Sequence, residues 1–163
     1  MIASPRRTVS ALALGVASAA ALVALVWQAT VWVQNARDDD RRTAAVDVAK
    51  AQVLDLTTLD SASVASKVKA MGGRVTGDFK RQFDGFSTTF AKVVQHDQIQ
   101  ATGEIKAAGI TSYDDDSAVV IVASTAQVAS ESQKSPTQRD YRISVSLDRS
   151  GGSWLISGME FVR

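Results

Sequence analysis

The chain has 163 residues, of which 45% are hydrophobic and 21% charged, proportions that fit one folded domain and exclude wholesale disorder. Its 18 basic and 17 acidic residues leave a net charge of +1, which argues against a dedicated nucleic-acid binder. The absence of cysteine excludes disulfides, thiolate metal sites and thiol nucleophiles, and a single histidine, His96, excludes a multi-histidine metal site.

An uncharged, apolar segment over residues 9–33 follows a short tail that carries two arginines. A helix of this length rises about 37 Å, enough to cross the hydrocarbon core of a bilayer. Ala17, Ser18 and Ala19 resemble a signal-peptide cleavage site, but the apolar sequence continues further than a signal peptide needs. We therefore expect a transmembrane helix over residues 9–33, with membrane-interface residues at Arg6, Arg7, Trp27 and Trp32.

The orientation of this span follows from the basic tail and from the long C-terminal part, since a long domain is translocated largely regardless of its charge. Residues 1–8 are then a cytoplasmic tail, and residues 34–163 form a periplasmic or extracytoplasmic domain on the plasma (inner) membrane. Small residues recur at every fourth position of the span, at Ala11, Gly15 and Ala19, a candidate face for packing against another transmembrane helix. The alternative is that the segment is simply rich in alanine.

The exported part is expected to begin with helices. A linker helix over residues 34–58 continues from the span, because Ala45, Ala49, either Gln52 or Val53, and Leu56 recur at helical spacing. Leu59, Asp60 and Ser61 supply an N-cap signal for a second helix, which should end at Gly72 and Gly73.

A third helix should follow Thr76 and Gly77. Four of the five phenylalanines fall on one of its faces, at Phe79, Phe83, Phe86 and Phe90. Such a stripe is compatible with a ligand- or lipid-contacting face, but it is more typical of a core helix that packs on a sheet.

After Gln98 the pattern changes to the two-residue period of strands. Four strands are predicted, over residues 99–110, 117–129, 140–149 and 153–161, with a polar loop over residues 130–139. Trp154 is interpreted as a core residue of the last strand, with an interface anchor as the alternative. Three helices followed by four antiparallel strands predict an α+β domain.

The sequence shows no constellation typical of an enzyme. His96 and Asp97 are adjacent, and in an extended chain their side chains point to opposite sides, so we expect no catalytic dyad. No Gly-x-Ser-x-Gly motif and no glycine-rich phosphate loop occur. The aspartate runs at residues 38–40 and 114–116 lack the spacing of metal ligands and are expected to be solvated. We therefore expect a non-catalytic protein with no cofactor and no bound metal.

The chain resembles the actinobacterial Mce-associated membrane proteins. The resemblance rests on the apolar segment leading into Arg37, Asp38 and Asp39, on the strand over residues 116–123, and on the terminal hairpin over residues 141–160 with its Gly-Gly-Ser-Trp-Leu turn. It covers nearly the whole chain. It implies an NTF2-like fold similar to the VirB8 periplasmic domain, a cone of three helices packed on a curved four-stranded antiparallel sheet.

The same resemblance implies a function. The chain is then a non-catalytic accessory or stabilising subunit of an Mce-type lipid transporter, which carries fatty acids or sterols through the cell envelope. Its partners are the permease and substrate-binding proteins of that transporter, contacted through the transmembrane helix and the exported domain, with no role for nucleic acid. The alternatives are a VirB8-like assembly component of a secretion or conjugation machine, and a stand-alone lipid-binding envelope protein.

Overall fold

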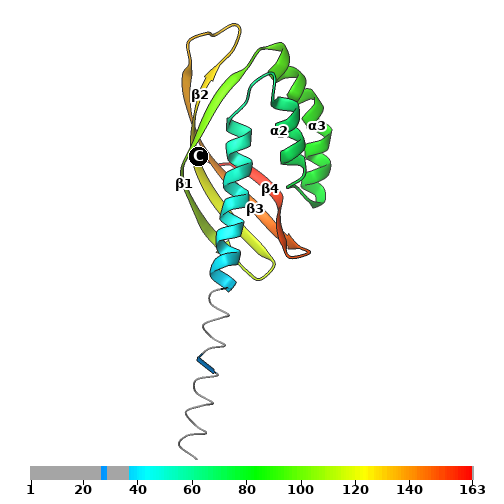
Figure 1. Cartoon of the computed structure of the whole chain (residues 1–163), viewed down its shortest axis with the longest axis vertical. Helices are drawn as coiled ribbons and strands as arrows, with labels where there is room; N and C mark the ends of the chain where they lie inside the picture. Colours follow the sequence, from blue (N-terminus) through cyan, green and yellow to red (C-terminus); the bar gives the residue numbers. More distant parts are fainter. Residues whose placement is uncertain (1–26, 29–36, 163) are drawn as a thin grey trace, which may run out of the picture. The chain divides into compact units, whose positions relative to one another are not determined.

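The computed structural model describes residues 27–28 and 37–162, and the chain divides into two compact units between Arg41 and Arg42. The folded domain belongs to the second unit (Figure 1). The predicted packing face at Ala11, Gly15 and Ala19, and most of the predicted span, lie outside the described residues. None of the helices that are described is long and apolar enough to cross a membrane.

Three helices precede four strands along residues 37–162. The first helix covers residues 37–57 and is followed by α2 (Val64–Gly72) and α3 (Gly77–His96). The strands are β1 (Gln100–Tyr113), β2 (Ser117–Ala129), β3 (Thr137–Ser150) and β4 (Ser153–Phe161). This order confirms the predicted α+β class.

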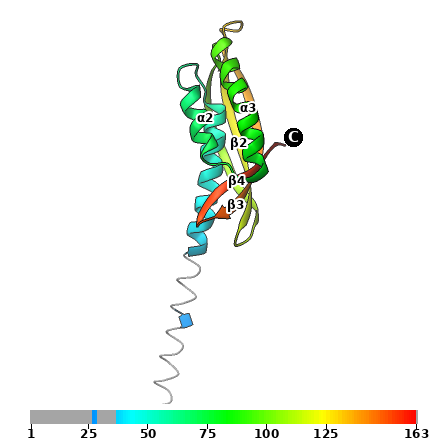
Figure 2. The ribbon, with the colours of Figure 1, turned by 90° about the vertical axis from the view of Figure 1, so that its right-hand side faces the viewer.

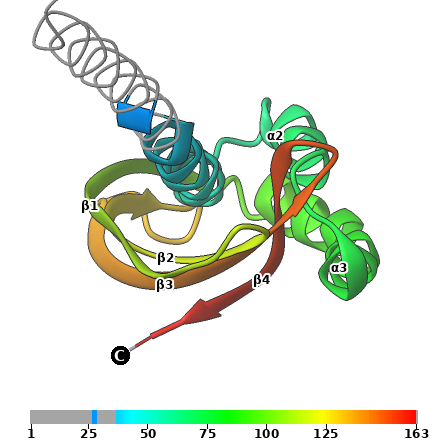
Figure 3. The ribbon, with the colours of Figure 1, turned by 90° about the horizontal axis from the view of Figure 1, so that it is seen from below.

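The sheet is an antiparallel meander with the strand order β1-β2-β3-β4. Gly151 and Gly152 turn β3 into β4 with φ angles of 58° and 86°, a left-handed conformation that suits glycine in a two-residue hairpin. The β1–β2 register shifts twice, between Ile105 and Ala107 and between Ile110 and Ser112. Because such irregularities bend a strand and increase its twist, they account for the curvature of the sheet in Figure 3.

The first helix lies on the concave face of this sheet (Figures 1 and 3). Its Ala45, Ala49 and Val53 are fully buried, as the helical spacing predicts, and the two alanines allow the helix to approach the sheet closely. Alternate residues of β2 and β3 complete this core from the sheet: Val120, Val122, Ile143, Val145 and Leu147.

The Asp60 carboxylate accepts hydrogen bonds from the backbone N–H groups of Ala62 and Ser63 at 2.9 Å, so it caps the turn before α2. The N-cap residue of α2 itself is Ser63, so the predicted N-cap signal at residues 59–61 lies before the start of the helix. After α2 the chain touches the sheet edge: the N–H of Ile156 donates to the Arg74 carbonyl at 2.7 Å, and the N–H of Thr76 donates to the Ile156 carbonyl at 2.9 Å. α3 then packs on α2 and on β4, and it lies on the side of α2 facing away from β1 (Figures 1 and 2).

Two of the four strands, β1 and β3, are longer than the sequence-based expectation, and their other boundaries shift by one residue. β1 continues past Ile110 to Tyr113, and β3 begins at Thr137 rather than Asp140, so the predicted polar loop is correspondingly shorter. The β2–β3 pairing extends to Val128 and Thr137. The polar residues in this part pair through their backbone groups, so their polar side chains did not indicate a strand. β4 has the predicted bounds. Trp154 is buried, in ring contact with Tyr113, which confirms its interpretation as a core residue.

Candidate functional site

The most enzyme-like pair in the sequence, His96 and Asp97, lies where α3 ends. The prediction that their side chains diverge was wrong: the chain is still helical at His96, and the His96 Nδ1 and Asp97 Oδ1 atoms are 2.8 Å apart. This hydrogen bond, together with the charge of Asp97, raises the pKa of His96. Both side chains are exposed, and the only hydrogen bond found for the His96 ring within the described residues is to Asp97, so no hydroxyl nucleophile is held against it.

The acidic runs gather no metal site in the described part of the chain, where no group of three or more His, Asp or Glu side chains lies close enough to share an ion. Residues 114–116 form the exposed turn between β1 and β2, as expected, and the N–H of Asp114 donates to the Ser117 carbonyl at 2.8 Å. Asp38, Asp39 and Asp40 are helical.

The phenylalanine stripe of α3 divides between core and surface. Phe83 is buried against Gly72 of α2, while Phe79 and Phe90 are partly buried beside the two apolar clusters. Phe86 is 45% exposed, so the prediction of a core face fails at this position. The rings stack edge to face along the helix, with centroids 5.3 Å apart for Phe83 and Phe86 and 6.2 Å apart for Phe86 and Phe90.

An apolar row on α3 therefore remains at the surface. Val93 stands two turns after Phe86, on the same side of the helix, and is 46% exposed. Charged pairs occupy other positions of the same helix, at Lys80 with Asp84 and at Arg81 with Asp78. We name Phe86 and Val93 the α3 row; an apolar strip flanked by charge is typical of a surface that contacts another protein.

The helix layer beneath α3 is held in position by a half-buried ionic cluster. Asp55 of the first helix pairs with Arg74, and its other oxygen lies 3.5 Å from Lys67 of α2. Arg74 also donates to the buried amide oxygen of Gln52 at 3.1 Å. The cluster joins the first helix to the segment around α2, and this gives it a structural role.

Of the predicted membrane-interface residues, Arg6, Arg7 and Trp32 lie outside the described residues. Trp27 is helical and exposed. The predictions for this segment therefore stay predictions.

Comparison with known proteins identifies a sequence family. The family described as "Uncharacterized protein Rv1363c/MT1408-like" matches residues 4–163, and the chain belongs to it. A relative from Mycobacterium tuberculosis, "Uncharacterized protein Rv1363c", is 30% identical over 139 residues, which is 85% of this chain and 52% of the relative. The chain thus spans about half the length of that relative.

Solved structures share the fold at low identity. An IcmL-like type IV secretion system protein from Legionella pneumophila has a TM-score of 0.59 at 10% identity, covering 74% of this chain and 91% of its own. Agrobacterium tumefaciens VirB8 has a TM-score of 0.57 at 8% identity, covering 71% and 88%. A putative aromatic ring hydroxylase from Novosphingobium aromaticivorans has the same TM-score at 16% identity, covering 75% and 89%. The VirB8-like fold expected from the sequence is confirmed, and proteins described as a secretion-system protein and as a putative ring hydroxylase share it.

Proposed function

We propose that this member of the Rv1363c/MT1408-like family is a non-catalytic assembly subunit of a multi-protein complex in the cell envelope. Its N-terminal segment anchors it in the membrane, and its VirB8-like domain binds a partner protein through the α3 row. The observation that carries the proposal is the exposure of Phe86 and Val93, at 45% and 46%, on a helix of which only part of the surface packs against the rest of the domain.

The first helix, the sheet and α2 supply most of the buried core, and α3 contributes only Phe83 and Val94 as buried side chains. Exposed apolar side chains gain no folding free energy from burial, and binding a partner would remove them from water. An aromatic side chain in such a position is also a common energetic centre of protein interfaces.

The fold comparisons favour a secretion or conjugation machine as the complex, because one structure with this fold is an IcmL-like type IV secretion system protein and VirB8 has the same fold. An accessory role beside an Mce lipid transporter is the second candidate, and its support is the sequence resemblance of the apolar segment and of the terminal hairpin. Both candidates predict a partner protein at α3 and differ in which partner is found. The non-catalytic role is supported by the exposure of His96 and its lack of a hydroxyl partner in the described structure.

The test is a purification of the full chain, tagged at its N-terminus, from its own membranes in mild detergent after lysine crosslinking. Lys92 lies next to Val93 on α3 and should crosslink to the bound partner, which mass spectrometry identifies. Secretion components crosslinked to Lys92 are the expected result. If Mce permease and substrate-binding proteins were crosslinked to the same lysine, the assembly role would stand, but the complex would be an Mce transporter and not a secretion or conjugation machine.

Matched variants locate the contact. Phe86→Ser combined with Val93→Ser should lower partner recovery by at least about fivefold, since truncation of interface anchors commonly costs that much affinity. Leu54→Ser is the control, because Leu54 is a similarly exposed apolar residue on the first helix. Equal recovery from all three proteins, or no crosslinked partner in the wild type, would contradict the proposal.

A further inference from the structure

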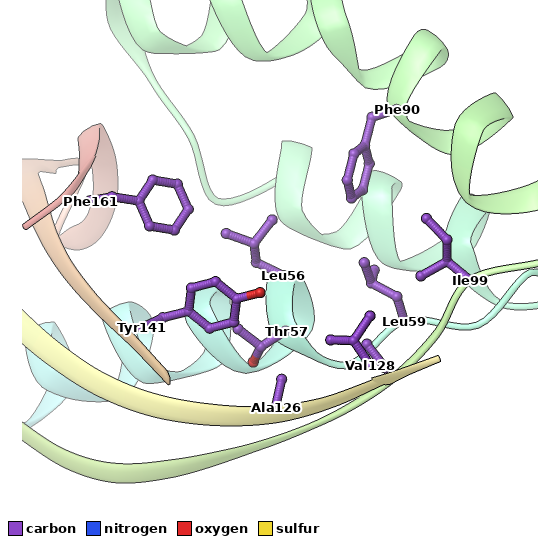
Figure 4. A pocket seen from close by; sticks show the side chains of 10 residues that line it. Leu56, Thr57, Leu59, Phe90, Ile99, Ala126, Val128, Tyr141 and Phe161 are labelled. Atoms are coloured by element: carbon purple, nitrogen blue, oxygen red, sulfur yellow. The ribbon is translucent and has the colours of Figure 1, made fainter. Parts of the chain in front are cut away.

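A cavity of about 220 Å³ opens between the end of the first helix, α3 and one end of the sheet (Figure 4). Leucine and isoleucine side chains at Leu56, Leu59 and Ile99 line it together with alanine and valine from the strands. Three aromatic rings complete the lining: Phe90 from α3, Tyr141 from β3 and Phe161 from the end of β4. Neither residue of the α3 row lines this cavity, so it is distinct from the surface proposed above.

The lining carries no charged side chain and only two polar ones, Thr57 and Tyr141. The Thr57 hydroxyl already donates to the Val53 carbonyl at 2.8 Å within the first helix. The Tyr141 hydroxyl is directed into the cavity toward Leu56 and Thr57 (Figure 4), and it has no hydrogen-bond partner among the described residues. The cavity thus offers apolar walls with one available hydroxyl.

The position of Phe161 is a second indication, beside the Tyr141 hydroxyl, that the cavity binds a ligand. Its side chain is 69% exposed at the end of β4, yet its ring stands 6.0 Å from that of Tyr141 and faces the cavity (Figure 4). A phenylalanine in this position adds little to the stability of the domain. It would enclose a molecule that occupies the cavity, and in doing so it would lose its exposure to water.

The size and the polarity together limit the ligand. An apolar cavity of about 150 Å³ stays dry and binds benzene, whereas sites for drug-sized molecules begin at about 300 Å³. The cavity therefore suits a short hydrocarbon chain. A carboxylate or an ammonium group would lose its hydration here without an opposite charge to replace it, and so the bound part of the ligand is neutral.

We infer that this cavity binds the hydrocarbon chain of a neutral single-chain amphiphile, whose one hydroxyl or carbonyl oxygen hydrogen-bonds with the Tyr141 hydroxyl. Leu56, Leu59 and Ile99 contact the chain, and Phe90 and Phe161 enclose it. The inference does not depend on the proposed assembly role, since the two surfaces use different residues.

The test uses the full chain in lipid nanodiscs and three photoreactive probes of ten carbons with a mid-chain diazirine: the primary alcohol, the carboxylic acid and the alkane. Labelled residues are mapped by mass spectrometry, with 1-decanol as competitor. The alcohol should label the segments around Tyr141 and Phe161 saturably and more strongly than the acid. Diffuse labelling that 1-decanol does not reduce would overturn the inference.

Two substitutions separate the roles of the ring and the hydroxyl. Tyr141→Phe keeps the shape and removes one oxygen, so labelling by the alcohol should fall about fivefold while labelling by the alkane stays unchanged. Phe161→Ala should lower labelling by both probes about tenfold, because it removes the enclosing ring. Leu54→Ala is the control, an exposed apolar residue of the first helix that does not line the cavity, and it should change labelling less than about twofold.

The outcomes distinguish this inference from the assembly role. If the alcohol labelled Tyr141→Phe as strongly as the wild-type protein, the hydrogen bond would be contradicted. If the probes labelled Phe161→Ala as strongly as the wild-type protein, the site would be contradicted. Loss of labelling in Leu54→Ala as well would show that the variants report a general disturbance and would also overturn the inference. Partner recovery from Phe161→Ala should equal that of the wild type, so failure of one proposal leaves the other standing.

Discussion

The two ends of the domain differ in how completely the fold uses its apolar side chains. At the sealed end, the first helix lies in the curve of the sheet, and Ala49, Val53, Val120 and Val145 are entirely buried. At the open end, formed by α3 and the cavity, Phe86 and Phe161 are 45% and 69% exposed to water. Stability is therefore concentrated where burial is complete, and recognition is expected where apolar surface is left over.

β2 and α3 differ in the same way in how many of their residues are buried. β2 is buried at alternate positions along most of its length, from Ala118 to Ala126. α3 has 20 residues, yet only Phe83 and Val94 are buried. A helix packed along so little of its surface opens locally at a lower free energy than a central strand does.

The largest predicted difference between the ends concerns two aromatic residues of β4. Trp154→Ala at the sealed end should lower the free energy of unfolding by about 3–5 kcal/mol, the usual cost of deleting a buried aromatic side chain. Phe161→Ala at the open end should cost less than about 1 kcal/mol, because its ring is mostly exposed. Urea unfolding followed by circular dichroism measures both, and similar costs would remove the distinction between the ends.

A pair of glycines on β1 tests the packing of the first helix. A Cβ atom on Gly103 would lie 2.8 Å from the Thr57 Cβ and 3.0 Å from the Thr57 carbonyl carbon, whereas one on Gly109 meets nothing within 4 Å. Gly103→Ala should therefore cost about 1–3 kcal/mol through overpacking. Gly109→Ala, on the same strand, should be nearly neutral, and an equal effect of both would contradict the close approach of helix and strand.

The ionic cluster between the first helix and α2 should contribute less. Asp55→Ala leaves Arg74 and Lys67 without their partner in a half-buried site and should cost about 1–2 kcal/mol. Asp47→Ala is the matched control on the same helix, because Asp47 and Lys50 form an exposed pair 3.3 Å apart whose loss should cost less than about 0.5 kcal/mol. Equal effects in thermal unfolding would mean that the Asp55 cluster does not hold the helices together.

The smallest effect concerns His96 at the end of α3. Its pKa should lie above the ordinary value of about 6.5, because Asp97 accepts a hydrogen bond from the ring and carries an opposite charge. A raised folded-state pKa means that this stabilisation is present below the unfolded-state pKa and is lost as the pH rises through the folded-state pKa. An NMR titration of the single histidine measures it. In Asp97→Asn the pKa should return toward the ordinary value, and an unchanged pKa would contradict the contact.

The sealed end was predictable from the sequence because it obeys simple periods. Alanines at Ala45 and Ala49 mark the buried side of the first helix, alternating residues mark β2 and β3, and Gly151 with Gly152 marks the hairpin. These patterns report local geometry and burial, which one sequence records directly.

The open end was predicted only in part, because its features depend on neighbours that are distant in the sequence. The stripe that includes Phe83 and Phe86 looks uniform along the helix, and only the position of α2 separates the buried ring from the exposed one. Tyr141 and Phe161 belong to different strands and meet through the register of the sheet. A period-two pattern marks both as strand residues and gives no sign of a shared cavity.

The division between the two ends is tested most directly by amide hydrogen exchange on the wild-type full chain under native conditions. We expect slow exchange, near the global unfolding limit, for β2 and for the first helix from Ala45 to Val53, and exchange faster by at least about a hundredfold across the middle of α3. Equal protection of α3 and β2 would contradict this expectation, because α3 would then belong to the same cooperative core as the sheet.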